Sequence, residues 1–287
     1  MTTNTTLRAG VIGLGQIGGG VAICLARKQR PLAVYDVRAD ASDKLDGVPP
    51  VLESPAAVAR ACDVLMIAVL NAEQVRAVLE GPNGVLAGAH PGLRVVLLST
   101  IALNDLKEIA ALTAQHGVEL LDCGVTGGSE ADKGGLVSIL GGSDASAAHV
   151  MPVLQDFSCE VHHMGPSGSG MATKIARNMV HFSVWRAGVE GANLARAAGV
   201  DIGKFIDLVE AASTKPGASV TFWMDPSRIK GPSLKEFDTE AVARYTLMLQ
   251  QKDLEAAQEL AAQLGINIAA SEAARLNAEE TYGLKKG

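Results

Sequence analysis

Residues 9–18 have the sequence Ala-Gly-Val-Ile-Gly-Leu-Gly-Gln-Ile-Gly. Residues 9–15 predict a short buried strand that ends in a glycine turn, and residues 16–28 follow with apolar side chains at helical spacing. Residues 32–36, Leu-Ala-Val-Tyr-Asp, predict a second strand. This order of strand, glycine turn, helix and strand is typical of a doubly wound sheet that binds a dinucleotide.

The three glycines of the turn have separate physical roles. Gly13 permits the tight turn, Gly15 lets the backbone approach a pyrophosphate, and Gly18 lets the helix pack closely on the strand. The start of the helix offers free N–H groups and a positive dipole to the phosphates. The predicted cofactor contacts in this segment are Gly13, Leu14, Gly15, Gln16, Ile17 and Gly18.

An acidic residue ends the second strand. Asp36 follows Gly18 by eighteen residues, at the spacing where a carboxylate accepts the ribose hydroxyls of the adenosine. It would repel a 2′-phosphate, which favours NAD over NADP. Arg38, two residues later, works against this preference because an arginine there can hold a 2′-phosphate. NAD is the preferred prediction and NADP the alternative.

The alternation of strands and helices continues to about residue 165. Strands are predicted at 63–69, 94–98, 118–122, 136–141 and 160–163, and helices from Ser54-Pro55 and at 72–80, 103–116 and 144–157. Ligands bind at the carboxyl ends of parallel strands, so the predicted cofactor contacts are Val69, Leu70, Asn71, Ser99 and Thr100, with strand-end capping as the alternative. Gly124 to Gly128 form either a nest of N–H groups for a carboxylate or a plain loop.

The pattern changes after Gly165-Pro166. Helices alone are predicted from there on, at about 168–199, 201–212, 239–264 and 268–282, with a looser region at 213–236. The expected fold is therefore α/β, with an N-terminal Rossmann-type doubly wound sheet followed by an all-α domain. The expected domains are 1–165 and 166–287, and the long helix 168–199 bridges them.

Two polar residues stand near the start of this long helix. Lys174 and Asn178 are four residues apart and so share one helix face. An amine and an amide on one face can hold and deprotonate a small hydroxylated substrate. A solvated lysine and asparagine are the structural alternative, and the nucleotide-binding pattern is what favours the functional one.

Composition limits the class of protein. The chain has 287 residues, 48% hydrophobic and 20% charged, which is typical of a globular protein. A net charge of −6 argues against a nucleic-acid partner, and no apolar run is long enough to predict a membrane span. The four cysteines, Cys24, Cys62, Cys123 and Cys159, have no metal-like or disulfide-like spacing, which predicts buried thiols in the cytoplasm. No metal site is predicted.

Several motifs together resemble the β-hydroxyacid dehydrogenases, the group of 3-hydroxyisobutyrate dehydrogenase and tartronate semialdehyde reductase, related to 6-phosphogluconate dehydrogenase. Residues 13–18 resemble the cofactor loop of that family, and residues 99–101 its nicotinamide-side Ser-Thr segment. Residues 122–128 are similar to its substrate loop, usually Asp-x-Pro-Val-Ser-Gly-Gly, and residues 168–178 to its catalytic motif. Residues 190–201 resemble the end of its bridging helix, and residues 252–254 a late segment whose lysine approaches the cofactor.

The resemblance implies reversible hydride transfer between a nicotinamide cofactor and a small β-hydroxy acid or its semialdehyde. It implies Lys174 as general acid and base, Asn178 as its catalytic partner, and Lys252 near the cofactor. It also implies substrate contacts at Thr126, Gly127, Gly128 and Arg177. A homodimer is expected, mostly by analogy with the family.

The chain departs from the family pattern at positions that line the substrate. Gly124 replaces the usual Pro, Thr126 the usual Ser, and Arg177 stands where relatives carry Asn or His. Arg177 either binds a carboxylate or phosphate bidentately or points outward into solvent. Three alternative functions stay open at this point: an imine reductase of similar fold, a decarboxylating oxidation, and a non-catalytic dinucleotide-binding sensor.

Overall fold

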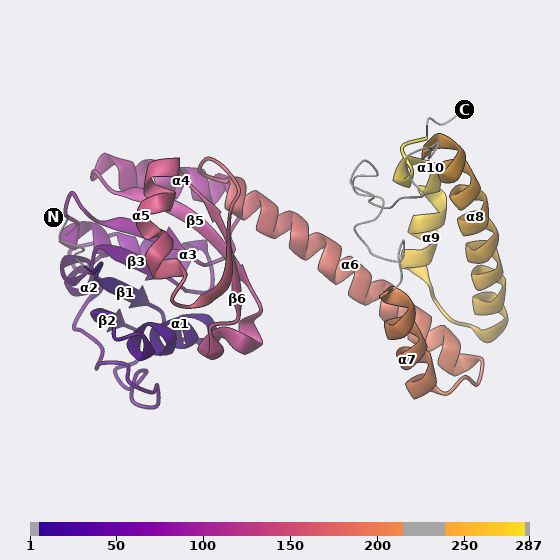
Figure 1. Cartoon of the computed structure of the whole chain (residues 1–287), viewed down its shortest axis with the longest axis horizontal. Helices are drawn as coiled ribbons and strands as arrows, with labels where there is room; N and C mark the ends of the chain where they lie inside the picture. The colour runs from indigo at the N-terminus through magenta and orange to yellow at the C-terminus, as the bar shows by residue number, and fades with distance from the viewer. Residues whose placement is uncertain (1–5, 215–238, 285–287) are drawn as a thin grey trace. The chain divides into compact units, whose positions relative to one another are not determined.

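The computed structural model describes residues 6–214 and 239–284, which divide into two compact units, 1–178 and 179–287 (Figure 1). The predicted loose region 213–236 lies almost entirely outside the described residues. The strands of the first unit are β1 (Ala9–Ile12), β2 (Leu32–Tyr35), β3 (Val64–Ile67), β4 (Arg94–Leu97), β5 (Glu119–Thr126), β6 (Leu136–Gly141) and β7 (Ser158–His163). Its helices are α1 (Gln16–Arg27), α2 (Pro55–Ala61), α3 (Ala72–Leu79), α4 (Leu103–Gln115), α5 (Asp144–Leu154) and the start of α6 (Ser169–Ala197).

The seven strands form one sheet in the order β2-β1-β3-β4-β5-β6-β7. All neighbouring pairs are parallel except β5 and β6, which are antiparallel. Because the chain returns from β2 to pair β3 on the other side of β1, strand order reverses between β1 and β3. Such a switch point leaves a crevice for ligands at the carboxyl ends of the strands. This doubly wound sheet confirms the predicted fold class.

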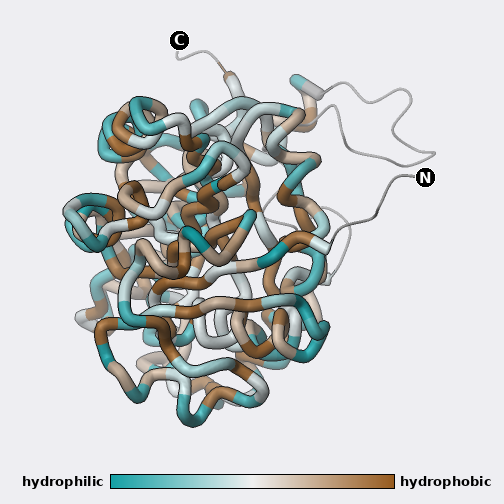
Figure 2. Tube along the Cα trace, turned by 90° about the vertical axis from the view of Figure 1, so that its left-hand side faces the viewer, coloured by the Kyte–Doolittle hydropathy of each residue, from teal (hydrophilic) through white to brown (hydrophobic). Residues whose placement is uncertain are grey.

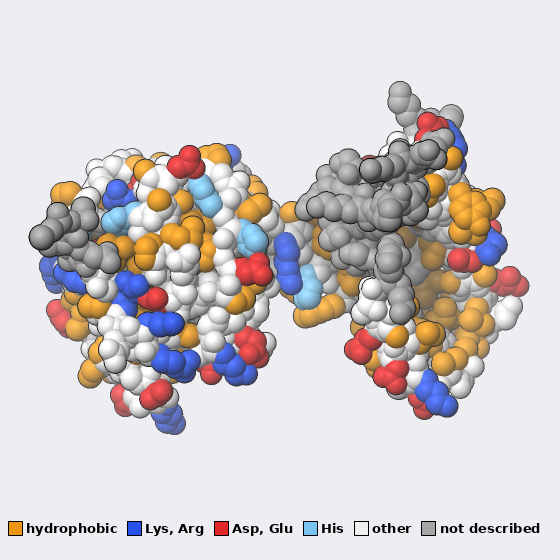
Figure 3. Space-filling view, in the orientation of Figure 1, with side chains coloured by type: hydrophobic (Ala, Val, Ile, Leu, Met, Phe, Trp, Pro, Cys, Tyr) orange, Lys and Arg blue, Asp and Glu red, His pale blue; other side chains and the backbone are white. Residues whose placement is uncertain are grey.

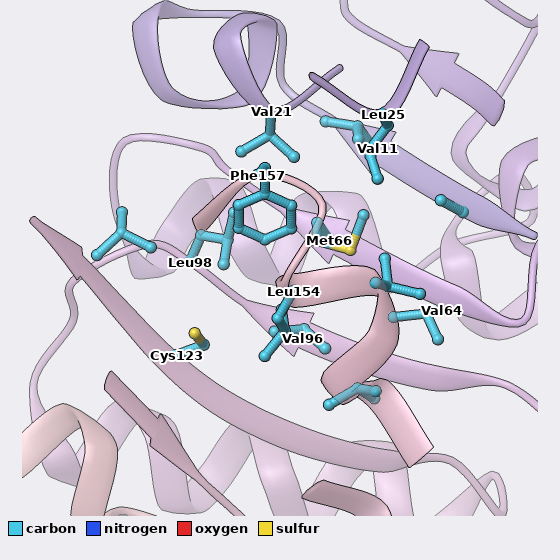
Figure 4. Packing of buried hydrophobic residues seen from close by; sticks show 14 of the residues in the cluster. Val11, Val21, Leu25, Val64, Met66, Val96, Leu98, Cys123, Leu154 and Phe157 are labelled. Carbon is cyan, nitrogen blue, oxygen red and sulfur yellow. The ribbon is translucent and has the colours of Figure 1, made fainter. Parts of the chain in front are cut away.

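Apolar side chains cover both faces of this sheet because successive strand residues point to opposite sides. On one face, Val11, Met66 and Val96 pack with α1 and α5 (Figure 4). On the other face, Ile12 and Leu65 pack with α2, α3 and α4. Figure 2, with this unit toward the viewer, shows the brown hydrophobic segments running through its interior.

Polar residues before three of the helices fix where those helices begin. Ser54 accepts a hydrogen bond from the Ala57 N–H at the start of α2, and Ser143 caps α5 in the same way. Asn71 accepts from the Gln74 N–H at the start of α3. The predicted helix start at Ser54-Pro55 is confirmed.

The second unit consists of helices in its described part. They are the rest of α6, α7 (Ile202–Ser213), α8 (Thr239–Leu264), α9 (Ala269–Leu276) and α10 (Ala278–Thr281). Glu190 of α6 is buried, and its carboxylate accepts the N–H groups of Ala270 and Ser271 at the start of α9. Large hydrophobic side chains remain on the surface of this unit (orange in Figure 3). No helix among the described residues has the length and hydrophobicity needed to cross a membrane.

Three sequence predictions were wrong in detail. β5 does not end at Asp122 but continues to Thr126, because its second half pairs with β6. The predicted helix 268–282 is two helices, since the Asn277 amide bonds back to the Ala273 carbonyl and the backbone leaves the helix there. Cys159 is exposed on β7, whereas the other three cysteines are buried as predicted.

Candidate active site

The glycine turn after β1 has the geometry that its spacing predicts. Gly13 adopts φ 87°, and a Cβ there would lie 2.5 Å from the Ala68 carbonyl oxygen. A Cβ at Gly18 would lie 1.8 Å from the Gly13 carbonyl oxygen, so only glycine lets the helix approach the strand. A Cβ at Gly15 would meet no atom within 4 Å, which leaves open space where the pyrophosphate is expected.

A pocket of about 310 Å³ lies beside this turn, at the switch point between β1 and β3. Gly13, Gly15 and Asp36 line it together with Val69 and Val78. Val37 at its rim is 88% exposed. Gly15 precedes α1, and no side chain caps the first N–H groups of this helix. An apolar wall, an open glycine turn and an uncapped helix start fit an adenosine and a pyrophosphate.

The Asp36 carboxylate is already bound to the protein on both oxygens. Oδ2 accepts the Leu14 N–H at 2.8 Å, and Oδ1 accepts the Arg38 N–H at 3.0 Å and the Arg38 Nε at 3.1 Å. Burial raises the pKa of Asp36, but these hydrogen bonds and the Arg38 charge outweigh it and hold the pKa below its ordinary value. Asp36 is therefore charged at neutral pH, and the Arg38 guanidinium is paired with it.

The strand-end residues lie at the same edge of the sheet. The Ser99 hydroxyl accepts the Val69 N–H at 3.0 Å and donates to the Val69 carbonyl at 2.6 Å. The Asn71 side-chain oxygen caps α3 by accepting the Gln74 N–H. This is the capping role that the sequence left open as the alternative to cofactor contact. Leu70 is 81% exposed, and Thr100 is exposed after β4.

The loop after β5, which resembles the substrate loop of the family, lies against α1. Gly127 adopts φ 87° between β5 and a short 3-10 helix, η2 (Gly128–Lys133). The Gln16 amide donates to the Gly128 carbonyl at 3.3 Å, and a Cβ at Gly128 would lie 3.2 Å from Ile17 Cδ1. Further along, the Cys24 thiol donates to the Ala131 carbonyl. Residues 13–18 and 126–128, more than 100 positions apart in the chain, are thus brought together.

Lys174 lies over the same strand. It is 7% exposed, and its aliphatic stem lies against Gly124 of β5. Burial, and then the charge of Arg177, lower the pKa of Lys174 from its ordinary value.

Arg177 and Asn178 follow on the next turn of α6. Arg177 is half-buried, and its Nη1 donates to the Asn178 side-chain oxygen at 3.4 Å. The described residues place no carboxylate within ion-pair distance of Arg177. With its oxygen engaged by Arg177, Asn178 keeps its NH₂ group as a donor.

Lys252 belongs to the second unit. It lies exposed on α8, with its ammonium 3.3 Å from the Asp253 carboxylate. Its approach to the cofactor stays a prediction. Among the described residues, no group of three or more histidine, cysteine or acidic side chains is arranged to hold a metal ion.

One residue at this site was not predicted to act there. Asp122 is fully buried, and its carboxylate accepts the N–H groups of Gly168 and Met171 at the start of α6. The signal available in the sequence was a carboxylate in an otherwise apolar strand, since a buried charge needs partners.

Comparison with known proteins agrees with this geometry. Residues 8–165 match the model of the NAD binding domain of 6-phosphogluconate dehydrogenase, and residues 168–282 match that of the NAD-binding domain of NADP-dependent 3-hydroxyisobutyrate dehydrogenase. The chain belongs to the β-hydroxyacid dehydrogenase family. It is an oxidoreductase of the hydroxyacid dehydrogenase type, with domains that bind NAD or NADP.

Individual relatives support the family assignment. L-threonate dehydrogenase of Escherichia coli O6:H1 is 33% identical over 80% of this chain and 76% of its own length. A solved oxidoreductase-like structure from Mycobacterium avium 104 superimposes with a TM-score of 0.83 at 27% identity, over 98% of this chain and 100% of the other. An imine reductase from Pseudomonas sp. superimposes with a TM-score of 0.77 at 17% identity, over 98% of this chain and 96% of its own, which shows a shared fold alone.

Proposed function

We propose that this dehydrogenase interconverts a small β-hydroxy acid and its carbonyl form, with Lys174 as the general acid and base. The observation that carries the proposal is the position of Lys174, which is buried against β5 while the substrate loop of the same strand packs on the cofactor helix. A nicotinamide cofactor, when bound, supplies the hydride chemistry. The protein binds, orients and moves the proton.

Lys174 handles the proton at Nζ. A free lysine has a pKa near 10.4, so at neutral pH it is an ammonium and a poor base. Because burial and the Arg177 charge lower that pKa, a larger fraction of Lys174 is neutral and can take the hydroxyl proton during oxidation. In the reverse direction the ammonium returns the proton to the carbonyl oxygen.

The remaining predicted substrate residues surround this proton transfer. The Asn178 NH₂ group donates to the reacting oxygen, since the amide oxygen is held by Arg177. Thr126, Gly127 and Gly128 receive the substrate carboxylate, because a left-handed residue such as Gly127 can turn successive backbone N–H groups toward one anion. Arg177 binds a second anionic group, a carboxylate or a phosphate, since the described residues supply it no acidic partner.

We infer that NAD is the preferred cofactor. A charged Asp36 repels a 2′-phosphate, and Arg38, the residue suited to holding one, is paired with Asp36 at 3.1 Å. The remaining proposed contacts are residues 13–18, Val69 to Asn71, Thr100 and, from the second unit, Lys252. NADP is favoured instead if Arg38 leaves Asp36 to bind a phosphate.

We also propose a homodimer in the cytoplasm. A second copy is the occupant that would cover the exposed large hydrophobic side chains of the second unit, such as Phe182 and Trp185. Four free thiols fit a reducing compartment. A monomeric mass by light scattering would exclude the dimer.

The experiment is a turnover screen followed at 340 nm, using short hydroxy acids and their aldehydes with NAD and NADP in parallel. Lys174→Ala should lower kcat by roughly 10²–10⁴-fold, the usual contribution of a positioned acid–base group, with cofactor affinity unchanged. Near-full turnover of Lys174→Ala would exclude the role of the lysine. Turnover only with an amine plus a ketone would indicate imine reduction, released CO₂ would indicate decarboxylation, and binding without turnover would indicate a sensor.

A further inference from the structure

The first turn of α6 is fastened directly to the sheet by Asp122. Its Oδ1 accepts the Gly168 N–H at 2.7 Å and its Oδ2 accepts the Met171 N–H at 2.6 Å. The first N–H groups of a helix have no partner inside the helix, and a buried carboxylate satisfies them with charge-assisted hydrogen bonds. Lys174 follows Met171 by three residues, less than one turn further along the same helix.

Two glycines allow this contact to be so close. A Cβ at Gly170 would lie 2.5 Å from the Ile139 carbonyl oxygen, and a Cβ at Gly141 would lie 2.6 Å from Asp122 Oδ1. The fully buried Met171 side chain joins the hydrophobic core on the face of the sheet that α2, α3 and α4 cover. Three contacts therefore hold the start of α6 on the sheet: the close backbone packing at Gly170, the buried Met171 side chain and the Asp122 carboxylate.

Gly124 shapes the space beside Lys174. It lies two residues after Asp122 on β5, so both residues face the same side of the sheet. A Cβ at Gly124 would lie 2.5 Å from Lys174 Cβ and 2.6 Å from Lys174 Cγ. Those atoms are close to the helix backbone, so the lysine cannot relieve such a clash by moving only its amine end.

We propose that Asp122 and Gly124 are positioning residues for Lys174: Asp122 holds the helix turn that carries the lysine, and Gly124 leaves the space in which its stem lies. In the family pattern that this chain resembles, a proline occupies position 124. The glycine is therefore a feature of this chain that leaves room for the Lys174 stem against β5, room that a side chain at position 124 would fill.

The charged groups around Lys174 indicate that Asp122 influences the lysine by fixing its position and not by pairing with its charge. Arg177 is the charged neighbour on its own helix, and Asp122 is the acidic residue of β5 beneath the helix start. The described residues include no ion pair between Asp122 and Lys174, and β6 carries no ionisable side chain between Leu136 and Gly141. Asp122 thus acts through the backbone of α6.

This inference rests on the proposed role of Lys174, but it has a readout that does not need turnover. In full-length protein labelled with [¹³C]lysine, the Lys174 ε-carbon signal is identified by its loss in Lys174→Arg and titrated by NMR. Gly124→Ala should displace the stem toward water and raise the pKa of Lys174 toward its ordinary value. Gly92→Ala is the matched control, because a Cβ there makes only an ordinary 3.6 Å contact with the His90 ring.

Activity gives the second readout. Gly124→Ala should lower kcat about 10- to 100-fold, with cofactor affinity unchanged. In oxidation, where Lys174 is the base, the raised pKa should move the acidic limb of the pH profile to higher pH. Asp122→Asn, which keeps the shape of the side chain but offers one acceptor oxygen, should lower kcat in the same range in a protein that is folded by circular dichroism. If Gly124→Ala titrates like Gly92→Ala, or Asp122→Asn keeps full kcat, the positioning role is wrong.

The two proposals fail separately. A raised pKa of Lys174 in Gly124→Ala together with full turnover of Lys174→Ala would remove the catalytic role and keep the positioning. An unchanged titration together with an inactive Lys174→Ala would do the reverse.

Discussion

The two units of the chain bury their hydrophobic residues to very different extents. In the first unit, both faces of the sheet are covered, and residues such as Phe157, Leu121 and Ile67 are fully buried. In the described part of the second unit, α7 and α9 bury no residue, and Trp185 and Phe182 of α6 are 59% and 57% exposed. The rings of His181, Phe182 and Trp185 contact one another at the surface in tilted and edge-on arrangements.

The contrast shows that the units depend on different sources of stability. A sheet covered on both faces has its apolar surface inside one chain, which stabilises it without a partner. Helices are stabilised mostly by packing of an apolar face, and the apolar faces of the second unit are left on its surface. We therefore expect the stability of the first unit to depend less on protein concentration than the stability of the second unit.

The largest expected effect comes from a cavity in the hydrophobic core of the first unit. Phe157→Ala should lower the free energy of unfolding of the first unit by about 3–5 kcal/mol, because it leaves a cavity among Val21, Met66 and Leu98. Trp185 of α6 belongs to the second unit, so in a Trp223→Phe background tryptophan fluorescence follows that unit and far-UV circular dichroism follows both. The dichroism transition in urea should move to lower concentration much more than the fluorescence transition. Equal shifts would mean that the units unfold together.

The next effect concerns the second unit. Replacing both Phe182 and Trp185 by serine should weaken the proposed dimer by about 2–4 kcal/mol, because large aromatic anchors dominate most interfaces. Light scattering across a dilution series should show a dimer turning into a monomer at higher concentrations than in the wild type. Met164→Ser is the matched control, since Met164 is an exposed hydrophobic residue of the first unit. An unchanged dimer in the double variant would place the interface elsewhere.

The smallest effect is expected at Glu190. Burial raises the pKa of Glu190, but the Ala270 N–H, Arg186 and the Ser271 N–H outweigh it and lower the pKa. A lowered folded-state pKa stabilises above the unfolded value near 4.3, and this stability is lost as pH falls through the folded value. Glu190→Gln should cost the second unit about 1 kcal/mol at pH 7, since water screens a unit with few buried residues.

The measurement for Glu190 is the fluorescence-detected unfolding midpoint at pH 7 and at about pH 3.5. The difference between wild type and Glu190→Gln should shrink at the lower pH, where the wild-type carboxyl begins to protonate. At either pH, the unfolding transition of the first unit should be the same in wild type and in Glu190→Gln. A difference that is independent of pH would mean that the charge of Glu190 contributes nothing to the attachment of α9.

The sequence was most informative where spacing alone determines geometry. The glycine turn at 13–18 and Asp36 were predictable because strand, turn and helix leave few ways to place them, and the long helix was predicted at 168–199 against an observed Ser169–Ala197. The end of β5 was not predictable, because it depends on pairing with β6 across the loop at Gly127. Local pattern contains no information about such a partner.

The same limit applies to the surroundings of Lys174. Its three-residue spacing from Arg177 on one helix was visible in the sequence. That Gly124 and Asp122 lie beneath it was not, because those residues are about 50 positions away and only the folded sheet brings them together.

Asp36 has a consequence for anyone who would redesign the cofactor preference of this enzyme. Exchanging Asp36 for a small neutral residue is the simplest way to admit a 2′-phosphate, yet its carboxylate also accepts the N–H groups of Leu14 and Arg38. Removing it would free Arg38 for the phosphate and at the same time leave the Leu14 N–H of the glycine turn without its acceptor. A useful redesign therefore keeps an acceptor oxygen at position 36, as Asn or Ser would, and removes only the charge.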